Sequence, residues 1–337
     1  MMENYTVTGH IGEGAHGLVL RGRHLPSGRD VALKKVKVRK LEDGIPISIL
    51  RESKILKTVD CRYIVKLLDF FPQGLGFVLV FELMPSGLWE MLHDVENPIT
   101  LAQGKSYMRM LLMGLNYLHK NHIMHRDLKP ANLLISFEGE LKIADLGQAR
   151  LIWSDSKNES RPYTHQVATR WYRAPELLYG AKFYTQSVDL WAVGCILAEI
   201  IMKSPIFPGE TDIEQLAMVI SSLGTPTEES WPGLTSLPDY NKITFPESRR
   251  IPWETLVPDC PPDALSLIQG FLLYDADKRI TAQEALSHSY FFTPPLACPL
   301  SDMPKPKDGH RNKFRDREVK ADVLFEELFK QLSDFVP

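Results

Sequence analysis

The chain has 337 residues, more than one compact core of about 100 to 200 residues usually holds, so we expect two packed lobes or domains. Hydrophobic residues make up 44% and charged residues 24%, which is typical of a soluble globular protein and excludes a fibrous, a disordered or a membrane chain. The formal net charge of −3 provides no broad basic field, so nucleic acid is not an expected partner.

The amino terminus carries no sign of a secretory signal. Residues 1–5 lack the basic stretch followed by an apolar run that marks such a segment. The four cysteines are far apart in the sequence and form no Cys-x-x-Cys pair, which favours isolated reduced thiols. We therefore expect a chain that works inside the cell.

The first 84 residues are predicted to form mainly a β-sheet. Short runs rich in β-branched and aromatic residues alternate with turn residues such as Pro26-Ser27-Gly28, and they predict strands at 5–11, 18–25, 30–38, 65–70 and 77–82. One helix interrupts the strands at 46–59, because a proline stands at its start and apolar residues recur at helical spacing.

From residue 88 onward the pattern becomes helical, and the longest periodic segments are 101–120 and 187–202. The longest apolar run, 190–202, has 13 residues and includes Glu199, so it is too short to span a bilayer of about 30 Å and predicts a buried helix. The two halves differ in class. We predict an α+β fold in one domain at 5–292, with a small, mostly β lobe at 5–84 and a larger, mostly α lobe at 85–292.

Beyond Phe292 the composition shifts to Pro, Lys, Arg and Asp, which predicts a tail at 293–337 that leaves the compact fold. Within this tail, residues 323–332 place their apolar side chains along one face of a short amphipathic helix. Such a helix either docks back on the fold or binds a partner.

A glycine-rich stretch at 12–19 lies between two predicted strands. Gly12, Gly14 and Gly17 have no Cβ atom, so backbone amides there can approach phosphate oxygens closely. A purely structural hairpin accounts for the same pattern, so this stretch needs support from other residues.

The next predicted strand contains Lys34, which the strand period places on the same face as Ala32 and opposite Lys35. Glu52 in the following helix is the candidate partner, because an ion pair would hold the ammonium group against the α- and β-phosphates of a nucleotide. The alternative is a surface lysine and an exposed helix glutamate without a shared role.

Three short motifs follow in order at 125–132, 145–147 and 174–176, reading His-Arg-Asp-Leu-Lys-Pro-Ala-Asn, Asp-Leu-Gly and Ala-Pro-Glu. Phosphoryl transfer needs an acceptor for a hydroxyl proton, oxygen ligands for Mg2+ and a cation near the moving charge. Asp127 can accept the proton, Asn132 and Asp145 can hold the metal, and Lys129 can steady the phosphate. Each aspartate alone would more often be a turn or cap residue, but the ordered set favours catalysis.

With these motifs, residues 5–292 resemble a eukaryotic protein kinase of the cyclin-dependent group. The residues that carry this resemblance are 46–52, Trp171 to Glu176, Phe207-Pro208-Gly209 and Leu223-Gly224-Thr225-Pro226. The resemblance implies a bilobal fold, ATP and Mg2+ as cofactors, and transfer of phosphate to serine or threonine of protein substrates. It also implies a cyclin or another activating partner, and a role in cell-cycle or ciliary control in the cytoplasm, the nucleus and the cilium.

The resemblance further implies the adenine site. Ile11, Val19 and Ala32 would lie above the base, Leu134 below it and Phe81 behind it, while backbone groups of Glu82 and Met84 would bind its edge. Each of these apolar residues would be core in any fold. Asp189 resembles the aspartate that braces the catalytic loop, Glu176 and Arg279 resemble a buried ion pair, and Lys129 with Thr169 resembles the serine/threonine class.

Thr164 lies between the metal motif and Ala174-Pro175-Glu176, where phosphorylation by an upstream kinase acts in this group. Arg51, Arg126 and Arg150 come from separate elements, and together they could bind a phosphate on Thr164. By resemblance, Ala168 and Arg173 shape a pocket for a proline after the target residue. The alternative is an exposed threonine with arginines that serve structural pairs only.

Several residues depart from the group's pattern. Leu146 stands where most kinases have phenylalanine and Gln148 replaces a residue that is usually apolar, so a scaffold without catalysis is the second hypothesis. A mitogen-activated kinase is disfavoured because 164–166 lacks the tyrosine of Thr-x-Tyr. The helix at 46–52 departs from the familiar cyclin-binding motif, which leaves the need for a cyclin open.

Overall fold

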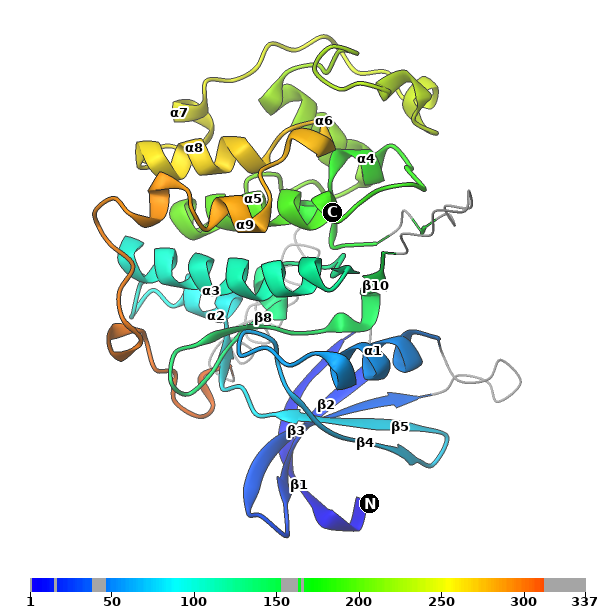
Figure 1. Cartoon of the computed structure of the whole chain (residues 1–337), viewed down its shortest axis with the longest axis vertical. Coiled ribbons are helices and arrows are strands. Elements are labelled where there is room, and N and C mark those ends of the chain that lie inside the picture. Colours follow the sequence, from blue (N-terminus) through cyan, green and yellow to red (C-terminus); the bar gives the residue numbers. More distant parts are fainter. Residues whose placement is uncertain (1, 15–16, 38–46, 153–162, 165–166, 312–337) are drawn as a thin grey trace, which may run out of the picture.

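The computed structural model describes residues 2–14, 17–37, 47–152, 163–164 and 167–311, and Figure 1 shows the whole chain. The amino-terminal lobe is an antiparallel sheet with the strand order β1-β2-β3-β5-β4. Its strands are β1 (Tyr5–Gly14), β2 (Gly17–His24), β3 (Arg29–Lys37), β4 (Leu67–Gln73) and β5 (Gly76–Glu82). The five predicted strands are therefore present, with ends that move by up to three residues.

The sheet has two faces of different character, as the strand period requires. Its own core consists of Val31, Leu33, Phe71, Val78 and Val80 in the part of the chain that the structure describes. The side chains of Ala32 and Lys34 alternate with those of Val31 and Leu33 and line a pocket on the opposite face. Lys34 is thus available to a ligand while its neighbours build the lobe.

Helix α1 (Ile47–Thr58) is the one helix predicted among the strands, and it lies between the sheet and the helical lobe (Figure 1). Ile55 and Leu56 are buried in the core of the helical lobe, and Ile49 is 2% exposed. The apolar side of α1 therefore ties the two lobes together and fixes the place of Glu52.

The carboxy-terminal lobe is built around α3 (Leu101–Lys120) and α5 (Ser187–Met202), whose bounds match the predicted ones. A capping box begins α3, because the Thr100 side chain accepts from Gln103 N and the Gln103 side chain accepts from Thr100 N. Helix α5 is buried along nearly its whole length, as its apolar sequence predicts. Among the helices of the described ranges, none has both the length and the apolar character needed to cross a membrane.

The remaining helices and short strands complete this lobe. The helices are α2 (Leu88–His93), α4 (Pro175–Leu178), α6 (Asp212–Leu223), α7 (Trp253–Leu256), α8 (Pro262–Phe271) and α9 (Ala282–Ala285). The short strands are β6 (Ser86–Gly87), β7 (Ile123–Met124), β8 (Leu133–Ile135), β9 (Leu141–Ile143) and β10 (Arg150–Leu151). Strands β6, β8 and β9 form one small sheet under the pocket, and β7 pairs with β10.

Residues 293–311 do not leave the compact fold, although the composition of this region predicts a tail. Met303 is 3% exposed and belongs to the core of the helical lobe, and Ser106 of α3 donates to Cys298 O at 3.0 Å. The segment runs along the edge of the helical lobe toward the sheet lobe (Figure 1). A few apolar side chains thus hold a mostly polar stretch in place. The amphipathic helix predicted at 323–332 lies outside the described residues.

Candidate active site

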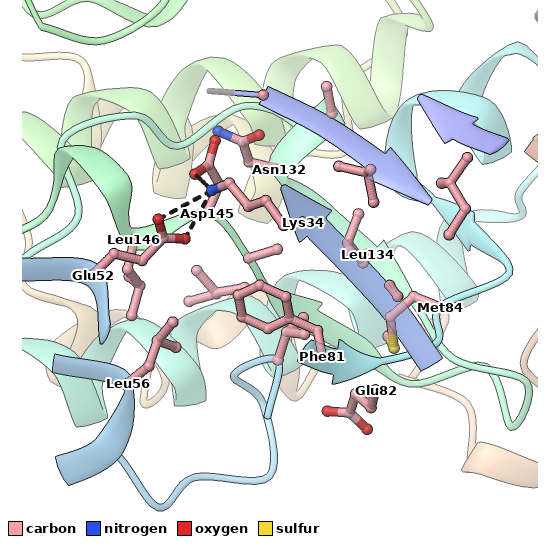
Figure 2. Close-up of a pocket in the computed structure, with 18 of the residues that line it drawn as sticks. Lys34, Glu52, Leu56, Phe81, Glu82, Met84, Asn132, Leu134, Asp145 and Leu146 are labelled. Atoms are coloured by element: carbon pink, nitrogen blue, oxygen red, sulfur yellow. Dashed lines mark hydrogen bonds and ion pairs between the residues drawn. The ribbon is translucent and has the colours of Figure 1, made fainter. Parts of the chain in front are cut away.

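A buried ion-pair network stands at the inner end of the pocket between the lobes. Lys34 Nζ lies 2.8 Å from Glu52 Oε1 and 2.9 Å from Asp145 Oδ1, as Figure 2 shows. The lysine comes from β3, the glutamate from α1 and the aspartate from the loop after β9. The structure thus brings together the predicted pair and the predicted metal ligand.

The surroundings of Lys34 keep it charged. Burial alone would lower the pKa of its ammonium group, but the carboxylates of Glu52 and Asp145 outweigh this effect and raise the pKa above its ordinary value. A charged ammonium group can donate charge-assisted hydrogen bonds to the oxygens of a phosphate.

The same pocket is lined by most of the residues predicted to hold the adenine and its neighbours. They are Ile11, Gly17, Val19, Ala32, Phe81, Glu82, Met84, Leu134 and Asp145. Strands β1 to β3 supply its wall on the side of the sheet lobe, the segment after β5 its outer edge, and β8 with the loop after β9 its wall on the side of the helical lobe.

Gly17 of the glycine-rich hairpin lines this pocket. Gly12 pairs with Val19, and Gly14 pairs with Gly17. Gly17 has φ of 123°, and a Cβ atom there would lie 2.3 Å from the carbonyl oxygen of Lys35. Glycine is therefore required at this position, where β2 begins close against β3.

Asp127 is the most heavily supported side chain of the catalytic loop, and it is 5% exposed. Its Oδ2 atom accepts from Asn132 Nδ2 at 2.9 Å and lies 3.2 Å from Lys129 Nζ. Its Oδ1 atom accepts from the backbone N of Thr169 at 2.9 Å and from Thr169 Oγ1 at 3.0 Å. These donors fix the orientation of the carboxylate.

The backbone of the catalytic loop is held by Asp189 from the first turn of α5. Its Oδ1 accepts from Arg126 N at 2.7 Å, and its Oδ2 accepts from His125 N at 2.9 Å and contacts His119 Nε2 at 2.9 Å. Complete burial would raise the pKa of Asp189, but the His119 hydrogen bond and the neighbouring donors outweigh it and lower that pKa. The predicted bracing role of Asp189 is confirmed.

The backbone of the site is strained at Arg126 and at Asp145. Arg126 has φ of 68° and Asp145 has φ of 60°, in the left-handed region that side chains other than glycine seldom adopt. Such conformations persist when surrounding contacts over-determine them, and they cluster at functional sites. Here Asp189 accepts a hydrogen bond from the backbone N of Arg126, while Lys34 pairs with the carboxylate of Asp145.

Leu146 fills the apolar position next to Asp145. It is fully buried, belongs to the core of the helical lobe and lines the pocket beside Leu56. Leucine thus occupies the hydrophobic slot, as expected for a chain that keeps its catalytic arrangement. Gln148 contributes its backbone, because Gln148 O accepts from Arg126 Nε at 2.8 Å.

The residues at the inner end fit a magnesium ion shared with phosphates. The side chains of Asn132 and Asp145 lie next to each other there (Figure 2). Within the described part of the chain, no group of three acidic, histidine or cysteine side chains forms a ready cage for a metal. Mg2+ prefers oxygen ligands and is usually held by one or two protein groups together with water and substrate phosphates. One carboxylate and one amide oxygen match that preference.

Thr164 is exposed, and the structure links it to Arg126 through Tyr184 and places Arg150 against its neighbour Tyr163. Tyr184 OH donates to Thr164 O at 2.7 Å and accepts from Arg126 Nη1 at 2.8 Å. The guanidinium of Arg150 lies over the ring of Tyr163, 5.2 Å from its centre. Within the described residues, no carboxylate pairs with Arg126 or Arg150. The side chain of Arg51 lies outside the described part of the structure.

Arg173 holds the end of the same segment. Its Nε donates to Val167 O and its Nη2 donates to Ala168 O, both at 2.9 Å. Ala168 has φ of 66°, which turns its carbonyl toward the arginine. Arg173 also pairs with Asp212 of α6 at 2.8 Å. The backbone at 167–168 is therefore already engaged by the protein.

A second buried ion pair lies within the helical lobe. Arg279 donates to both oxygens of Glu176 at 2.7 Å, and the arginine side chain is fully buried. This confirms the pair expected for Glu176 and Arg279. Neither residue lines the nucleotide pocket, which indicates a structural role.

Sequence reasoning missed other residues of this region. Tyr184 links Thr164 to Arg126, yet no motif surrounds it in the sequence. Arg311 lines the nucleotide pocket although it follows the pocket's other residues by more than a hundred positions. Only the tertiary fold brings these side chains to the site.

The comparisons with known proteins agree with this geometry. A model of the protein kinase domain matches residues 5–291. Cyclin-dependent kinase 20 of Danio rerio is 56% identical over 312 residues, which cover 92% of this chain and 90% of that protein. Cyclin-dependent kinase 20 of Homo sapiens is 55% identical over 307 residues, 91% of this chain and 88% of that protein. Cyclin-dependent kinase D-1 of Oryza sativa subsp. indica is 41% identical over 309 residues, 91% of this chain and 72% of that protein.

Three stretches of the sequence, 12–17, 40–44 and 163–170, also resemble the cell cycle-related kinase within the cyclin-dependent group. Cyclin-dependent kinase 20 is that kinase, and its identity to most of this chain confirms the resemblance. The domain match likewise confirms the predicted bilobal fold. The chain belongs to the protein kinase family and is a serine/threonine protein kinase of the cyclin-dependent kinase type.

Proposed function

We propose that this kinase transfers the γ-phosphoryl group of ATP, with Mg2+ as the metal, to serine or threonine residues that precede a proline in protein substrates. The observation that carries the proposal is the closed arrangement of Lys34, Glu52 and Asp145 above a fixed Asp127. Phosphate transfer needs this group and Asp127 together, because the γ-phosphate and the attacking substrate hydroxyl must be aligned. This arrangement also argues against the scaffold hypothesis.

Asp127 would orient the substrate hydroxyl and accept its proton. Its carboxylate is held by donors from Asn132 and Thr169, so it cannot turn away from the incoming group. Lys129 lies between Asp127 and Thr169, with its ammonium 2.6 Å from Thr169 Oγ1. Its positive charge would stabilise the transferred phosphate oxygens.

Asn132 and Asp145 would hold the metal, and Lys34 would bind the α- and β-phosphates. Magnesium, when bound, neutralises charge on the phosphate oxygens. Glu52 fixes the lysine from the side of the sheet lobe, so nucleotide binding and the position of α1 are linked.

The preference for proline would arise at 167–168. Val167 O and Ala168 O both accept from Arg173, so the amide N–H of a substrate residue beside them would lack a partner. Proline has no such N–H group and avoids the cost of burying it.

We further propose that an upstream kinase phosphorylates Thr164. The phosphate would bring about −1.5 to −2 charges to Arg126 and Arg150, and to Arg51 if its side chain reaches the same place. Charge-assisted hydrogen bonds would then order the segment that holds Arg173.

The relatives are named cyclin-dependent kinases, which supports a cyclin or a similar protein as an activating partner. We also propose a role in cell-cycle and ciliary regulation, in the cytoplasm, the nucleus and the cilium. Fluorescent tagging of the chain in ciliated cells would test the location. A signal that never overlaps with a ciliary marker would contradict the ciliary part.

A phosphate-transfer assay tests the reaction itself. We expect wild type to label a protein substrate from radiolabelled ATP in the presence of Mg2+, and Asp127→Asn to lose about 100-fold or more, as typical for removal of a general base. The control is Asp277→Asn, an exposed aspartate far from the pocket. Equal labelling by wild type and Asp127→Asn would contradict the proposal.

A further inference from the structure

The segment 304–311, which we name the hinge strap, lies against the connection between the two lobes. Leu83, Met84 and Pro85 of that connection line one groove together with Asp308 and Arg311 of the strap. The strap also lines a second groove with Met91 and Asp94 of the helical lobe. It therefore runs along the outer edge of the nucleotide pocket.

The strap is anchored to the sheet lobe by an ion pair. Arg21 Nη1 donates to Asp308 Oδ2 at 2.5 Å, and Arg21 Nη2 donates to Asp30 at 2.7 Å. Asp308 thus extends a pair that already exists within the sheet. This contact reaches from the end of the described chain to β2.

Two further anchors join the strap to the helical lobe. His310 contacts Ser86 Oγ at 2.8 Å through Nδ1 and Asp94 Oδ2 at 3.1 Å through Nε2, and the histidine side chain is 10% exposed. Arg311 Nε lies 3.0 Å from Glu90 Oε1 of α2. Because the anchors lie in both lobes, the strap bridges the two lobes at the outer edge of the cleft.

The position of Gly87 shows how closely Arg311 and Glu90 are seated. A Cβ atom on Gly87 would lie 2.6 Å from Glu90 Oε2 and 3.1 Å from Arg311 Nη2. A larger residue at 87 would displace at least one of the two side chains. The glycine therefore makes room for this pair beside the pocket.

Arg311 also belongs to the lining of the nucleotide pocket, together with Ile11, Met84 and Leu134. If adenine binds at the backbone of Glu82 and Met84, and phosphates bind at Lys34, the sugar lies between them at the outer edge. We propose that Arg311, positioned by Glu90, hydrogen-bonds the ribose hydroxyls of the bound nucleotide and makes the hinge strap a third wall of the site. This inference rests on the proposed use of ATP.

The test compares nucleotides that differ only at the sugar. We expect wild type to bind ADP about fivefold more tightly than 2′,3′-dideoxy-ADP, as the loss of one or two hydrogen bonds predicts. Arg311→Ala should raise the dissociation constant for ADP by a similar factor and bind both nucleotides equally. Arg311→Lys should recover part of the discrimination, because it retains a cationic donor. Isothermal titration calorimetry measures all of these constants.

Lys307→Ala is the matched control, because Lys307 is an exposed cation of the same strap. It should bind both nucleotides as wild type does. In steady-state assays, Arg311→Ala should raise KM for ATP about fivefold and leave kcat and KM for the peptide within a factor of two. Discrimination by Arg311→Ala equal to that of wild type would overturn the proposal, and so would tighter ADP binding, which would mean that the strap obstructs the pocket.

A second variant tests the anchoring without changing Arg311. Asp308→Lys places a cation against Arg21 and should reduce sugar discrimination, whereas Asp302→Lys makes the same charge change on an exposed residue outside the strap and should not. Unchanged discrimination in Asp308→Lys would overturn the anchoring role. Calorimetry measures nucleotide binding without phosphate transfer, so the two proposals can fail separately. A chain that transfers no phosphate but still prefers ADP over 2′,3′-dideoxy-ADP would refute the proposed function and uphold this inference. A chain that binds no adenine nucleotide would refute both.

Discussion

Lys34 joins the two lobes at a single atom. Its Nζ contacts Glu52 from α1 and Asp145 from the helical lobe, at 2.8 and 2.9 Å. Any movement of α1 away from the pocket would break the first contact and leave a buried carboxylate without its cation, which is costly. The contact between Lys34 and Glu52 is therefore present only when α1 lies against the pocket.

Replacing Lys34 by methionine should abolish most phosphate transfer, with kcat/KM reduced by about 100-fold or more, because the phosphates lose their cation. The matched control is Lys35→Met, since Lys35 points to the other face of β3. Circular dichroism would verify that both variants fold. Full activity in Lys34→Met would show that another cation binds the phosphates.

Asp145→Asn should weaken turnover that depends on Mg2+, because the amide removes one ligand charge. A titration of Mg2+ at saturating ATP should show a higher half-saturating concentration than in wild type. Undiminished turnover across the titration would place the metal ligand elsewhere in the chain.

Glu199 gives a prediction that depends on pH. It accepts from Tyr172 OH at 2.7 Å in the core, and burial raises the pKa of the Glu199 carboxyl. The raised pKa means that the folded chain holds this proton more tightly than the unfolded chain. The stabilisation is complete below the unfolded pKa and is lost as the pH rises through the folded pKa.

Glu199→Gln can still accept from Tyr172 but carries no charge, so it should raise the melting temperature relative to wild type at about pH 8, with a smaller gain at about pH 5. Thermal unfolding followed by fluorescence would measure both. A variant that is less stable than wild type, by an amount that grows with pH, would contradict the assignment of the raised pKa.

At the scale of elements, the chain around Thr164 depends on contacts with distant parts of the sequence. Tyr184 bridges Thr164 and Arg126, and Arg150 covers Tyr163. Thr164→Ala, purified from cells in which wild type carries the phosphate, should lose about 10-fold or more in kcat/KM, because two or more charge-assisted bonds are missing. Equal rates for both proteins would refute the switch. Thr293→Ala, a threonine outside this segment, serves as the control.

The backbone at 167–168 should distinguish substrate peptides by the residue that follows the target serine. A peptide with Ser-Pro should have kcat/KM about 10-fold or more above the same peptide with Ser-Ala, since the alanine buries an N–H group without a partner. Peptides are compared at matched concentrations below KM. Similar values for both would refute the proline-directed assignment and leave phosphate transfer itself unaffected.

Elements could be predicted from the sequence where a local pattern determines them. The bounds of α3 and α5 follow from their apolar periodicity, and the small sheet lobe follows from its short strands. The left-handed residues Arg126, Asp145 and Ala168 could not be predicted, because each is held by hydrogen bonds from remote segments. The return of 293–311 was also missed, since a few buried residues such as Met303 outweigh a polar composition.

The residues of the candidate site also fall into those that the sequence could predict and those that it could not. Lys34, Asp127, Asn132 and Asp145 could be found because phosphate transfer requires their chemistry at characteristic positions in the chain. Arg311 could not, because an arginine in a polar tail carries no signal until the fold brings it to the pocket. Motifs therefore reveal the centre of the site, whereas its edge depends on tertiary structure.

At the scale of the whole molecule, the two lobes differ in how much apolar surface they bury. Within the described residues, the core of the sheet lobe consists of Val31, Leu33, Phe71, Val78 and Val80, whereas the core of the helical lobe extends from α1 to Met303. Regions with few buried contacts open at a lower free energy than the rest of a protein. The backbone amides of β1 to β5 should therefore exchange with deuterium faster than those of α3 and α5, which mass spectrometry would measure.

The small core of the sheet lobe also bears on the lifetime of the protein. A ligand that binds only the closed cleft stabilises it by RT ln(1 + [L]/Kd), about 2.7 kcal/mol at one hundred times Kd. Openings of the sheet lobe expose chain to proteases, and the rate of cleavage follows the population of the open form. The nucleotide would then act as a protectant as well as a substrate. Limited proteolysis of the purified chain should therefore be slower with saturating ATP and Mg2+ than without nucleotide.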